Sequence, residues 1–164
     1  MWRLSVDVVL IWGSSVLEAI ERMLELDPGE EVETRLEIAK RMLRRAREEL
    51  GRGDPVQASE KLYRAVEECI KILACLEGLD MCRRARGEGG WWTKLLAQAA
   101  SRLAQRLGEK LVLEAWLNAY DLHVHGFHEH AYTVEDIEPR VEVVERLITY
   151  TKNRLKQQDH HTKT

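Results

Sequence analysis

Hydrophobic residues recur every three or four positions along most of this chain, which is the spacing of one face of an α-helix. Two long stripes of this kind predict two helices. The stripes are Leu36, Ala39, Leu43, Ala46 and Leu50, followed by Ala58, Leu62, Val66, Cys69 and Leu73. The break between them is Gly51-Arg52-Gly53, after which Asp54 and Pro55 have the character of a helix cap and a first helical residue. Because the break is short, we expect the two helices to pack antiparallel.

Similar patterns predict the rest of the secondary structure. An earlier helix, capped by Ser14 or Ser15, should run to about Leu26. Further helices are expected from near Trp91 to Gly108 and from about Glu109 to His130. A last helix should follow the cap formed by Thr133 and Asp136, with its start delayed or kinked by Pro139.

Three stretches are expected to differ from these helices. Met81–Gly90 reads as a loop because it is rich in arginine and glycine, and the residues from about Gln157 read as a disordered tail. The apolar run Val6–Trp12 is the best candidate for a strand, although a helix is favoured over a strand there. Sustained alternation of the strand type is absent from the sequence. We therefore predict an all-α antiparallel bundle of five or six helices, with one domain over residues 1–157 and a tail over 158–164.

The charge balance limits the partners that the chain can attract. Lysines and arginines number 25 and acidic residues 28, which gives a net charge of −3. No global positive field draws such a chain to nucleic acid or anionic lipid, so RNA would have to bind a local patch. The apolar run near the start is too short to span a bilayer and lacks a signal peptide's cleavage site, so we expect no membrane association.

The cysteines indicate the compartment. Cys69, Cys75 and Cys82 are odd in number and lack the two-residue spacing of zinc or redox motifs. We interpret the first two as small apolar core residues, which suits a reducing cytosol and a cytoplasmic location. Asn118 and Asn153 are the only asparagines, and this scarcity of thermolabile amides favours a thermophilic source.

Two stretches are the most informative in the chain. One is Gly53-Asp54-Pro55-Val56-Gln57-Ala58-Ser59-Glu60-Lys61-Leu62-Tyr63, and the other is Leu122-His123-Val124-His125-Gly126-Phe127-His128-Glu129. With these residues the sequence resembles the archaeal PaREP family, which is grouped with the HEPN (higher eukaryote and prokaryote nucleotide-binding) helical domains. The likeness covers about Leu36 to Leu147 and includes Trp91–Leu107 and Ala115-Trp116. It implies a HEPN-like bundle and a homodimer.

The resemblance also implies candidate activities. Many HEPN domains are metal-independent ribonucleases whose motif is an arginine followed, after four to six residues, by a histidine. Such a histidine can move the 2′-hydroxyl proton while the arginine holds the phosphate. His123 takes the histidine position here, and the arginine position falls on Asn118, Leu117 or Trp116, none of which is basic. An accessory role beside a separate nucleotidyltransferase is a further expectation from the family.

His123 has two interpretations. It shares a helical face with Trp116, Tyr120 and Phe127, so it reads first as a core or interface histidine. If it is catalytic, the residues that can assist it are Asn118, His128 and Glu129.

The same histidine cluster raises the question of a metal site. On an α-helix His123 and His125 point about 200° apart, so only His125 with His128 or Glu129, or His123 with His130, share a face. Gly126 can break the helix and permit other pairings. We expect solvated or interface histidines, and no metal or other cofactor.

Basic and aromatic residues supply the candidates for ligand binding. Arg83, Arg84 and Arg86 can bind phosphate, and Trp91 and Trp92 can stack on a base. The alternatives are a solvated charged face and a buried helix start or dimer contact. Taken together, the sequence predicts a dimeric binding or interaction module for RNA, a nucleotide or another ligand, with the ribonuclease and the nucleotidyltransferase partner as alternatives.

Overall fold

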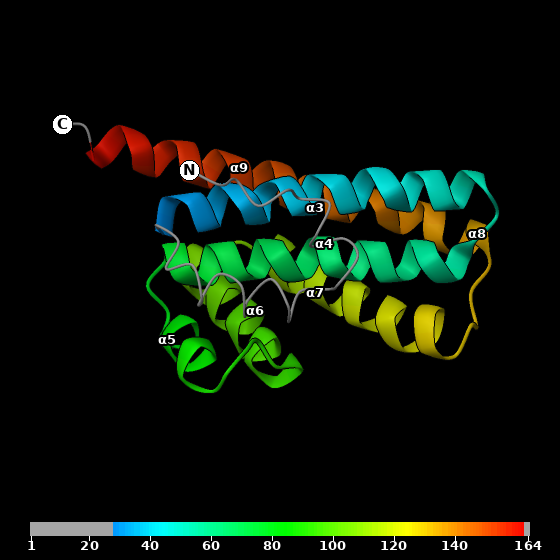
Figure 1. The fold of residues 1–164 in the computed structure, drawn as a ribbon, viewed down its shortest axis with the longest axis horizontal. Helices are drawn as coiled ribbons and strands as arrows, with labels where there is room; N and C mark the ends of the chain where they lie inside the picture. The colour runs from blue at the N-terminus through cyan, green and yellow to red at the C-terminus, as the bar shows by residue number, and fades with distance from the viewer. Residues whose placement is uncertain (1–27, 163–164) are drawn as a thin grey trace.

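The computed structural model describes residues 28–162. The predictions made for residues 1–27, including the helix from Ser14 or Ser15 to Leu26, lie outside the described residues. Within the described part every regular element is helical, as Figure 1 shows, which confirms the all-α prediction. No helix in this part is both long and apolar enough to cross a membrane.

The framework of the fold is a hairpin of two long helices. α3 spans Pro28–Gly51 and α4 spans Pro55–Leu76, and Figure 1 shows them side by side and antiparallel. The Oδ1 atom of Asp54 accepts a hydrogen bond of 2.9 Å from the backbone N–H of Gln57, so the predicted cap is confirmed. α4 is the central helix, since it packs against α3, α9, α7 and α6.

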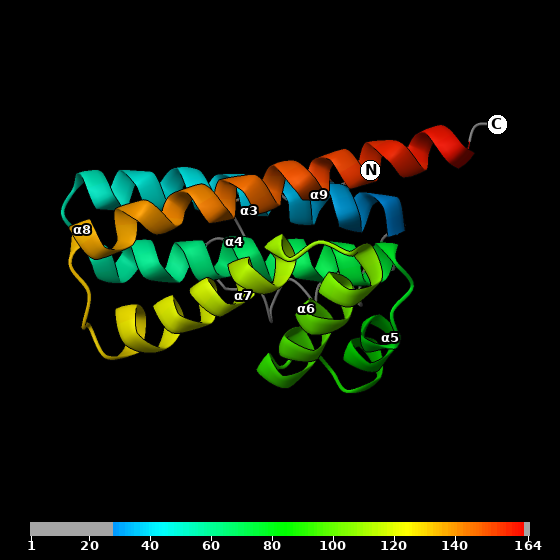
Figure 2. The same cartoon turned by 180° about the vertical axis from the view of Figure 1, so that it is seen from behind.

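The remaining helices cover α4 on its other sides. α6 (Thr93–Leu107) ends at Gly108, which adopts the left-handed conformation with φ 63° and allows the chain to turn at once into α7 (Leu111–Asp121). α7 continues without a break into η1 (Leu122–His128), a segment of π-helix. Figure 2 shows α9 (Val141–Thr162) running along the bundle, where it contacts both α4 and α7.

The start of α9 follows the predicted pattern. Thr133 and Asp136 form a capping box, with the Asp136 carboxylate accepting hydrogen bonds from the backbone N–H and the hydroxyl of Thr133. The short helix α8 (Val134–Ile137) then passes through a 3₁₀ turn, η2 (Glu138–Arg140), before α9 begins. Pro139 lies in that turn, so the expected delay is observed. α9 is helical as far as Thr162 and thus enters the predicted tail, while the domain limit at residue 157 stays a prediction.

The loop predicted over Met81–Gly90 is wrong, because α5 (Asp80–Gly87) occupies most of it. Met81 and Ala85 are four residues apart and both buried, so they hold one face of this helix against the core. Asp80 lies in the first turn and arginines lie in the last turn, where the helix dipole favours them. The charged residues that suggested a loop therefore stabilise a short helix.

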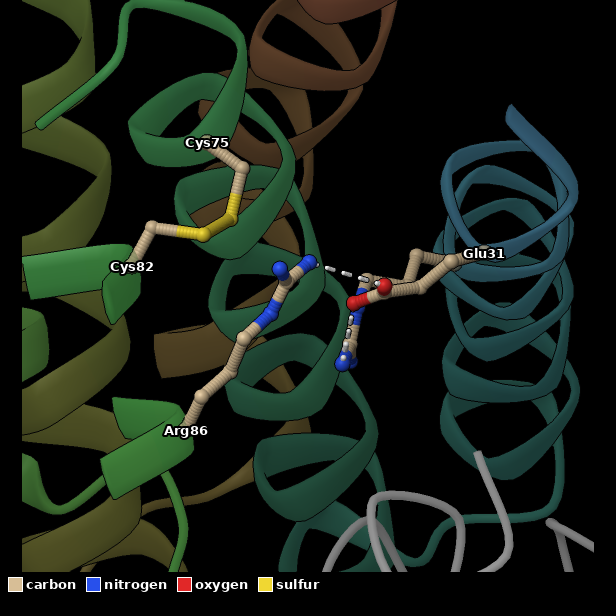
Figure 3. Close-up of a disulfide and its surroundings, with 5 residues drawn as sticks. Glu31, Cys75, Cys82 and Arg86 are labelled. Carbon is tan, nitrogen blue, oxygen red and sulfur yellow. Dashed lines mark hydrogen bonds and ion pairs between the residues drawn. A yellow bond between two sulfur atoms is a disulfide. The ribbon is translucent and has the colours of Figure 1, made fainter. Parts of the chain in front are cut away.

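The interpretation of Cys75 as a small core residue is also wrong. Cys75, near the end of α4, forms a disulfide with Cys82 of α5 (Figure 3), and their Cα atoms are 5.2 Å apart. Arg86 reaches past this disulfide to the carboxylate of Glu31 on α3, at 3.4 Å. Cys69 is buried as predicted, and burial raises the pKa of its thiol to about 12. With Cys75 and Cys82 paired, the cysteines no longer indicate a reducing compartment.

Buried charges join α3 to α4. The carboxylate of Glu68 accepts hydrogen bonds from Lys71 Nζ at 2.9 Å and from Arg35 Nη1 at 2.8 Å, and all three side chains are nearly or fully inaccessible to solvent. Burial by itself raises the pKa of the Glu68 carboxyl, but the two cations outweigh it and the net pKa is lowered. Glu68 is therefore ionised in the core.

Candidate functional site

The candidate site lies where α7 passes into the π-helix η1. Gly126, within η1, is pressed against α4: a β-carbon at this position would lie 2.8 Å from the β-carbon of Ser59. Only glycine permits this approach without displacing a neighbour. The backbone N–H of Glu129 donates to the carbonyl of Val124 at 3.0 Å, which is the five-residue spacing of a π-helix.

The π-helix brings two histidines together. An α-helix would turn residues five positions apart to different sides, whereas the wider π turn returns them to the same side. The Nε2 atoms of His123 and His128 are 3.1 Å apart, and the two rings meet edge to face with centroids 4.5 Å apart. α-Helical geometry would not allow this pair to share a face, but the segment is a π-helix, so His123 meets His128.

Residues of α4 hold His123 in place. Its Nδ1 atom lies 3.3 Å from Oε2 of Glu60, and its ring stacks on Tyr63 with centroids 4.2 Å apart. His123 is partly buried with 26% of its side chain accessible, whereas His128 is exposed. One imidazole of the pair is thus oriented by the core and the other faces solvent.

Basic residues of α4 lie near Glu60, the partner of His123. Arg64 Nε donates to the other oxygen of Glu60 at 2.7 Å. Burial lowers the pKa of the neighbouring Lys61, and the positive charge of Arg64 lowers it further, whereas Glu60 and Glu49 act in the opposite direction. The cations here are therefore partly balanced by carboxylates.

A second polar cluster surrounds Asp121, at the end of α7. The phenol of Tyr132 donates a hydrogen bond of 2.6 Å to Asp121 Oδ2, and Arg140 pairs with the same oxygen while its guanidinium lies over the Tyr132 ring. Burial is the largest single effect on the Asp121 carboxyl and raises its pKa, but the hydrogen bonds from Tyr132 and Arg140 and the positive charges nearby together outweigh it and lower the pKa overall. This cluster ties the α7 end to the start of α9.

Two of the predicted catalytic assistants lie apart from the His123–His128 pair. Asn118 donates from Nδ2 to the backbone carbonyl of Glu114, 3.1 Å away on its own helix. The Glu129 carboxylate lies 2.8 Å from Nδ1 of His125, and this hydrogen bond raises the pKa of His125. His125 and Glu129 do share a face, as the sequence indicated.

The residues predicted to bind a ligand lie at the other end of the bundle. Arg84 bonds to Gln98 on α6 and, with Arg102 and Arg106, lines a shallow cleft between α5 and α6. Trp91 packs against the core, while Trp92 is 59% exposed at the start of α6. Arg83 is exposed, and Arg86 is paired with Glu31 as described above.

Sequence reasoning missed Glu60, Tyr63 and Lys61 as site residues. All three belong to the first of the two informative stretches, and the fold packs that stretch directly against the second, since α4 contacts η1. Glu60 and Tyr63 are three residues apart and share one face of α4, whereas Lys61 lies off that face. Nothing local shows which helix the Glu60–Tyr63 face meets. Among residues 28–162, no group of three or more histidine, cysteine or acidic side chains is arranged to hold a metal ion.

Comparisons with known proteins agree with the fold. The profile of the Archaeal PaREP1/PaREP8 family matches residues 34–148. A crystal structure of a protein from Sulfolobus solfataricus is 33% identical, with a TM-score of 0.65 over 72% of this chain and 96% of that one. A solution structure of the same structural-genomics target gives 33% identity and a TM-score of 0.64, over 76% and 95% of the two chains. No curated protein matches the chain.

Proposed function

Since this chain belongs to the archaeal PaREP1/PaREP8 family, we propose that it is a HEPN-like, homodimeric binding module that takes RNA or a nucleotide at the cluster around His123. The observation that carries the proposal is the pairing of His123 with His128 beside Glu60 and Arg64 of α4. Imidazoles offer hydrogen bonds to phosphate and ribose, and cations offer charge. Arg64, Lys61 and Arg45 lie within electrostatic reach of one another, and Glu60 and Glu49 balance their charge only in part.

RNA binding tests this proposal directly. Fluorescence anisotropy with a labelled single-stranded RNA should give an affinity that falls as salt rises, because phosphate contacts release counterions. The double variant Lys61→Gln, Arg45→Gln should weaken binding about tenfold and reduce the salt dependence. Lys152→Gln with Lys156→Gln, at exposed positions on α9, makes the same change in charge and should leave affinity unchanged.

Two results would refute the RNA proposal. One is wild-type protein that binds neither RNA nor a nucleoside triphosphate. The other is an equal loss of affinity in the α4 and α9 double variants, which would show that overall charge and not the His123 cluster is responsible.

The orientation of His123 by Glu60 favours a second candidate, a metal-independent ribonuclease. A carboxylate that accepts from Nδ1–H leaves Nε2 able to take a proton from a 2′-hydroxyl. Metal-free protein would then cleave mixed RNA, and His123→Ala would abolish cleavage while remaining folded. His125→Ala, whose ring pairs with Glu129 instead, is the matched control and should cleave normally. If wild type cleaves nothing, this candidate fails and the binding module stands.

The proposed dimer is supported by exposed apolar residues on α7. Leu117 is 58% and Tyr120 43% exposed, three residues apart on one face of the helix. Sedimentation equilibrium should show a dimer that dissociates in Leu117→Ser with Tyr120→Ser. Trp92→Ser removes an equally exposed residue at the other end of the bundle and should leave the dimer intact. A wild-type monomer would refute the dimer, and co-purification with a nucleotidyltransferase would instead support the accessory role.

We also expect a cytoplasmic location in a thermophilic source. The Cys75–Cys82 disulfide agrees with a cytoplasmic location only if the source is also thermophilic. Intracellular disulfides are frequent in hyperthermophiles and rare in other cytosols. When cells are lysed in denaturant together with an alkylating reagent, mass spectrometry should find one alkylated cysteine, Cys69. Three reactive thiols would contradict the disulfide in the cell.

A further inference from the structure

We propose that His123 and His128 bind a divalent transition-metal ion, of the zinc, nickel or copper class, through their two Nε2 atoms. The two atoms face each other at 3.1 Å. Imidazole nitrogen is a preferred ligand of these metals, and the harder cations magnesium and calcium prefer oxygen. This inference rests on the proposed function in one respect: it names a ligand for the same His123–His128 pair.

The separation of the two nitrogens suits a shared metal. With zinc–nitrogen bonds of about 2.0–2.1 Å, two ligands of a tetrahedral site lie about 3.3 Å apart. In the square-planar geometry of copper or nickel, bonds of similar length put neighbouring nitrogens about 2.9 Å apart. The observed distance of 3.1 Å falls between these values. A metal ion can therefore enter with a small opening or closing of the pair.

Glu60 prepares His123 as a ligand. A carboxylate only accepts hydrogen bonds when ionised, so its Oε2 atom, 3.3 Å from Nδ1, favours the tautomer with the proton on Nδ1. The lone pair is then on Nε2, which points at His128. Histidine ligands of metals usually have such a carboxylate behind them, which orients the ring and increases its basicity. Stacking on Tyr63 fixes the plane of the same ring.

The competing interpretation is a hydrogen bond between the two rings. A distance of 3.1 Å also fits an N–H donor facing a nitrogen acceptor. In that case His128 would keep a proton on Nε2 and no metal would bind there. The two interpretations differ in one measurable respect: whether a metal ion displaces the proton on Nε2 of His128.

Two protein ligands leave coordination positions for water or for a phosphate oxygen. The exposure of His128 gives solvent access to the pair. A metal held there would add positive charge near Arg64, which pairs with Glu60. It would also occupy the nitrogen that the metal-independent ribonuclease needs, so metal binding and that reaction exclude each other at this site.

Calorimetric titration of the metal-free full-length protein with zinc chloride tests the inference. We expect one zinc per chain, with affinity falling in acid because histidine binds a metal only in its unprotonated form. His128→Asn should abolish this binding, and Glu60→Gln should weaken it about 10–100-fold. His125→Asn and the double variant His160→Gln, His161→Gln are matched controls and should bind as wild type does. Circular dichroism would verify that each variant is folded.

Copper provides an independent readout. The electron paramagnetic resonance spectrum of the protein with one equivalent of Cu²⁺ should show coupling to two imidazole nitrogens, and to no more than one in His128→Asn. Absence of zinc binding, or zinc binding that His128→Asn leaves unchanged, would overturn the inference. RNA affinity is measured on metal-free protein, so a failure to bind zinc does not affect the result for RNA. Likewise, a failure to bind RNA does not affect the result for zinc.

Discussion

A β-carbon on Gly126 would lie 2.8 Å from the β-carbon of Ser59 and closer still to its hydroxyl oxygen. This contact joins the π-helix η1 to the buried side of α4. Since η1 carries the histidine pair and α4 carries Glu60 and Tyr63, the distance between these two backbones determines the geometry of the candidate site.

Gly126→Ala should therefore destabilise the fold. Alanine favours a helix by about 1 kcal/mol, but overpacking against Ser59 costs about 1–3 kcal/mol, so we expect a net loss of about 1 kcal/mol. Urea denaturation measures it. Adding Ser59→Gly should restore part of the stability, because it removes the two Ser59 atoms that lie nearest to the new methyl group.

Gly87→Ala is the control for this change. A β-carbon there meets nothing within 4 Å, so the variant should equal or slightly exceed the wild type in stability. If Gly126→Ala behaved like Gly87→Ala, the close packing of η1 on α4 would be disproved.

Glu68→Gln should be among the more damaging substitutions in the core. It removes the carboxylate that joins Lys71 to Arg35. Each cation keeps one acidic partner, Glu67 at 2.9 Å for Lys71 and Glu31 at 3.2 Å for Arg35, so the loss of these two charged hydrogen bonds should cost about 2 kcal/mol. Thermal denaturation at neutral pH measures the loss. Glu37→Gln removes the exposed pair with Lys40 and should cost less than about 1 kcal/mol. Similar losses in the two variants would argue against an ionised Glu68.

The same carboxylate should give the fold an acid sensitivity. The pKa of Glu68 is lower in the folded protein than its ordinary value of 4.5, so its contribution to stability is fully present above pH 4.5. That contribution is lost as pH falls through the lower folded pKa. The difference in free energy of unfolding between wild type and Glu68→Gln should therefore shrink below pH 4.5. If this difference in free energy of unfolding instead grew as the pH fell, the result would contradict an ionised Glu68 in the ion pair.

The disulfide should stabilise the hairpin of α4 and α5. Cys75 and Cys82 are seven residues apart, and closing so short a loop in the unfolded chain corresponds to about 2.5 kcal/mol. The double variant Cys75→Ser, Cys82→Ser should unfold at correspondingly lower temperature. Reductant should lower the melting temperature of the wild type and leave that of the variant unchanged. A wild type indifferent to reductant would show that the bond contributes nothing.

Much of the helical pattern could be predicted from short stretches of sequence. The cap at Asp54, the stop at Gly108 and the capping box of Thr133 depend on neighbours a few residues away, and each occurs as expected. The loop predicted around Arg83 failed because arginine and glycine suggest exposure. Burial of Met81 and Ala85 against the core, which no local pattern shows, makes that stretch a helix.

The sequence by itself determined that the chain is all-α and where most of its helices end, because stripes and caps are local properties. Only the tertiary structure decided which histidines meet. The packing of Gly126 on Ser59 accompanies a π-helix, and that geometry pairs His123 with His128 and not with His130. Glu60 and Tyr63 reach the same place from 60 residues or more earlier in the chain, since the fold packs α4 against η1. Contacts of that kind depend on how whole helices pack against one another. A sequence pattern shows only which residues lie on each face of a single helix.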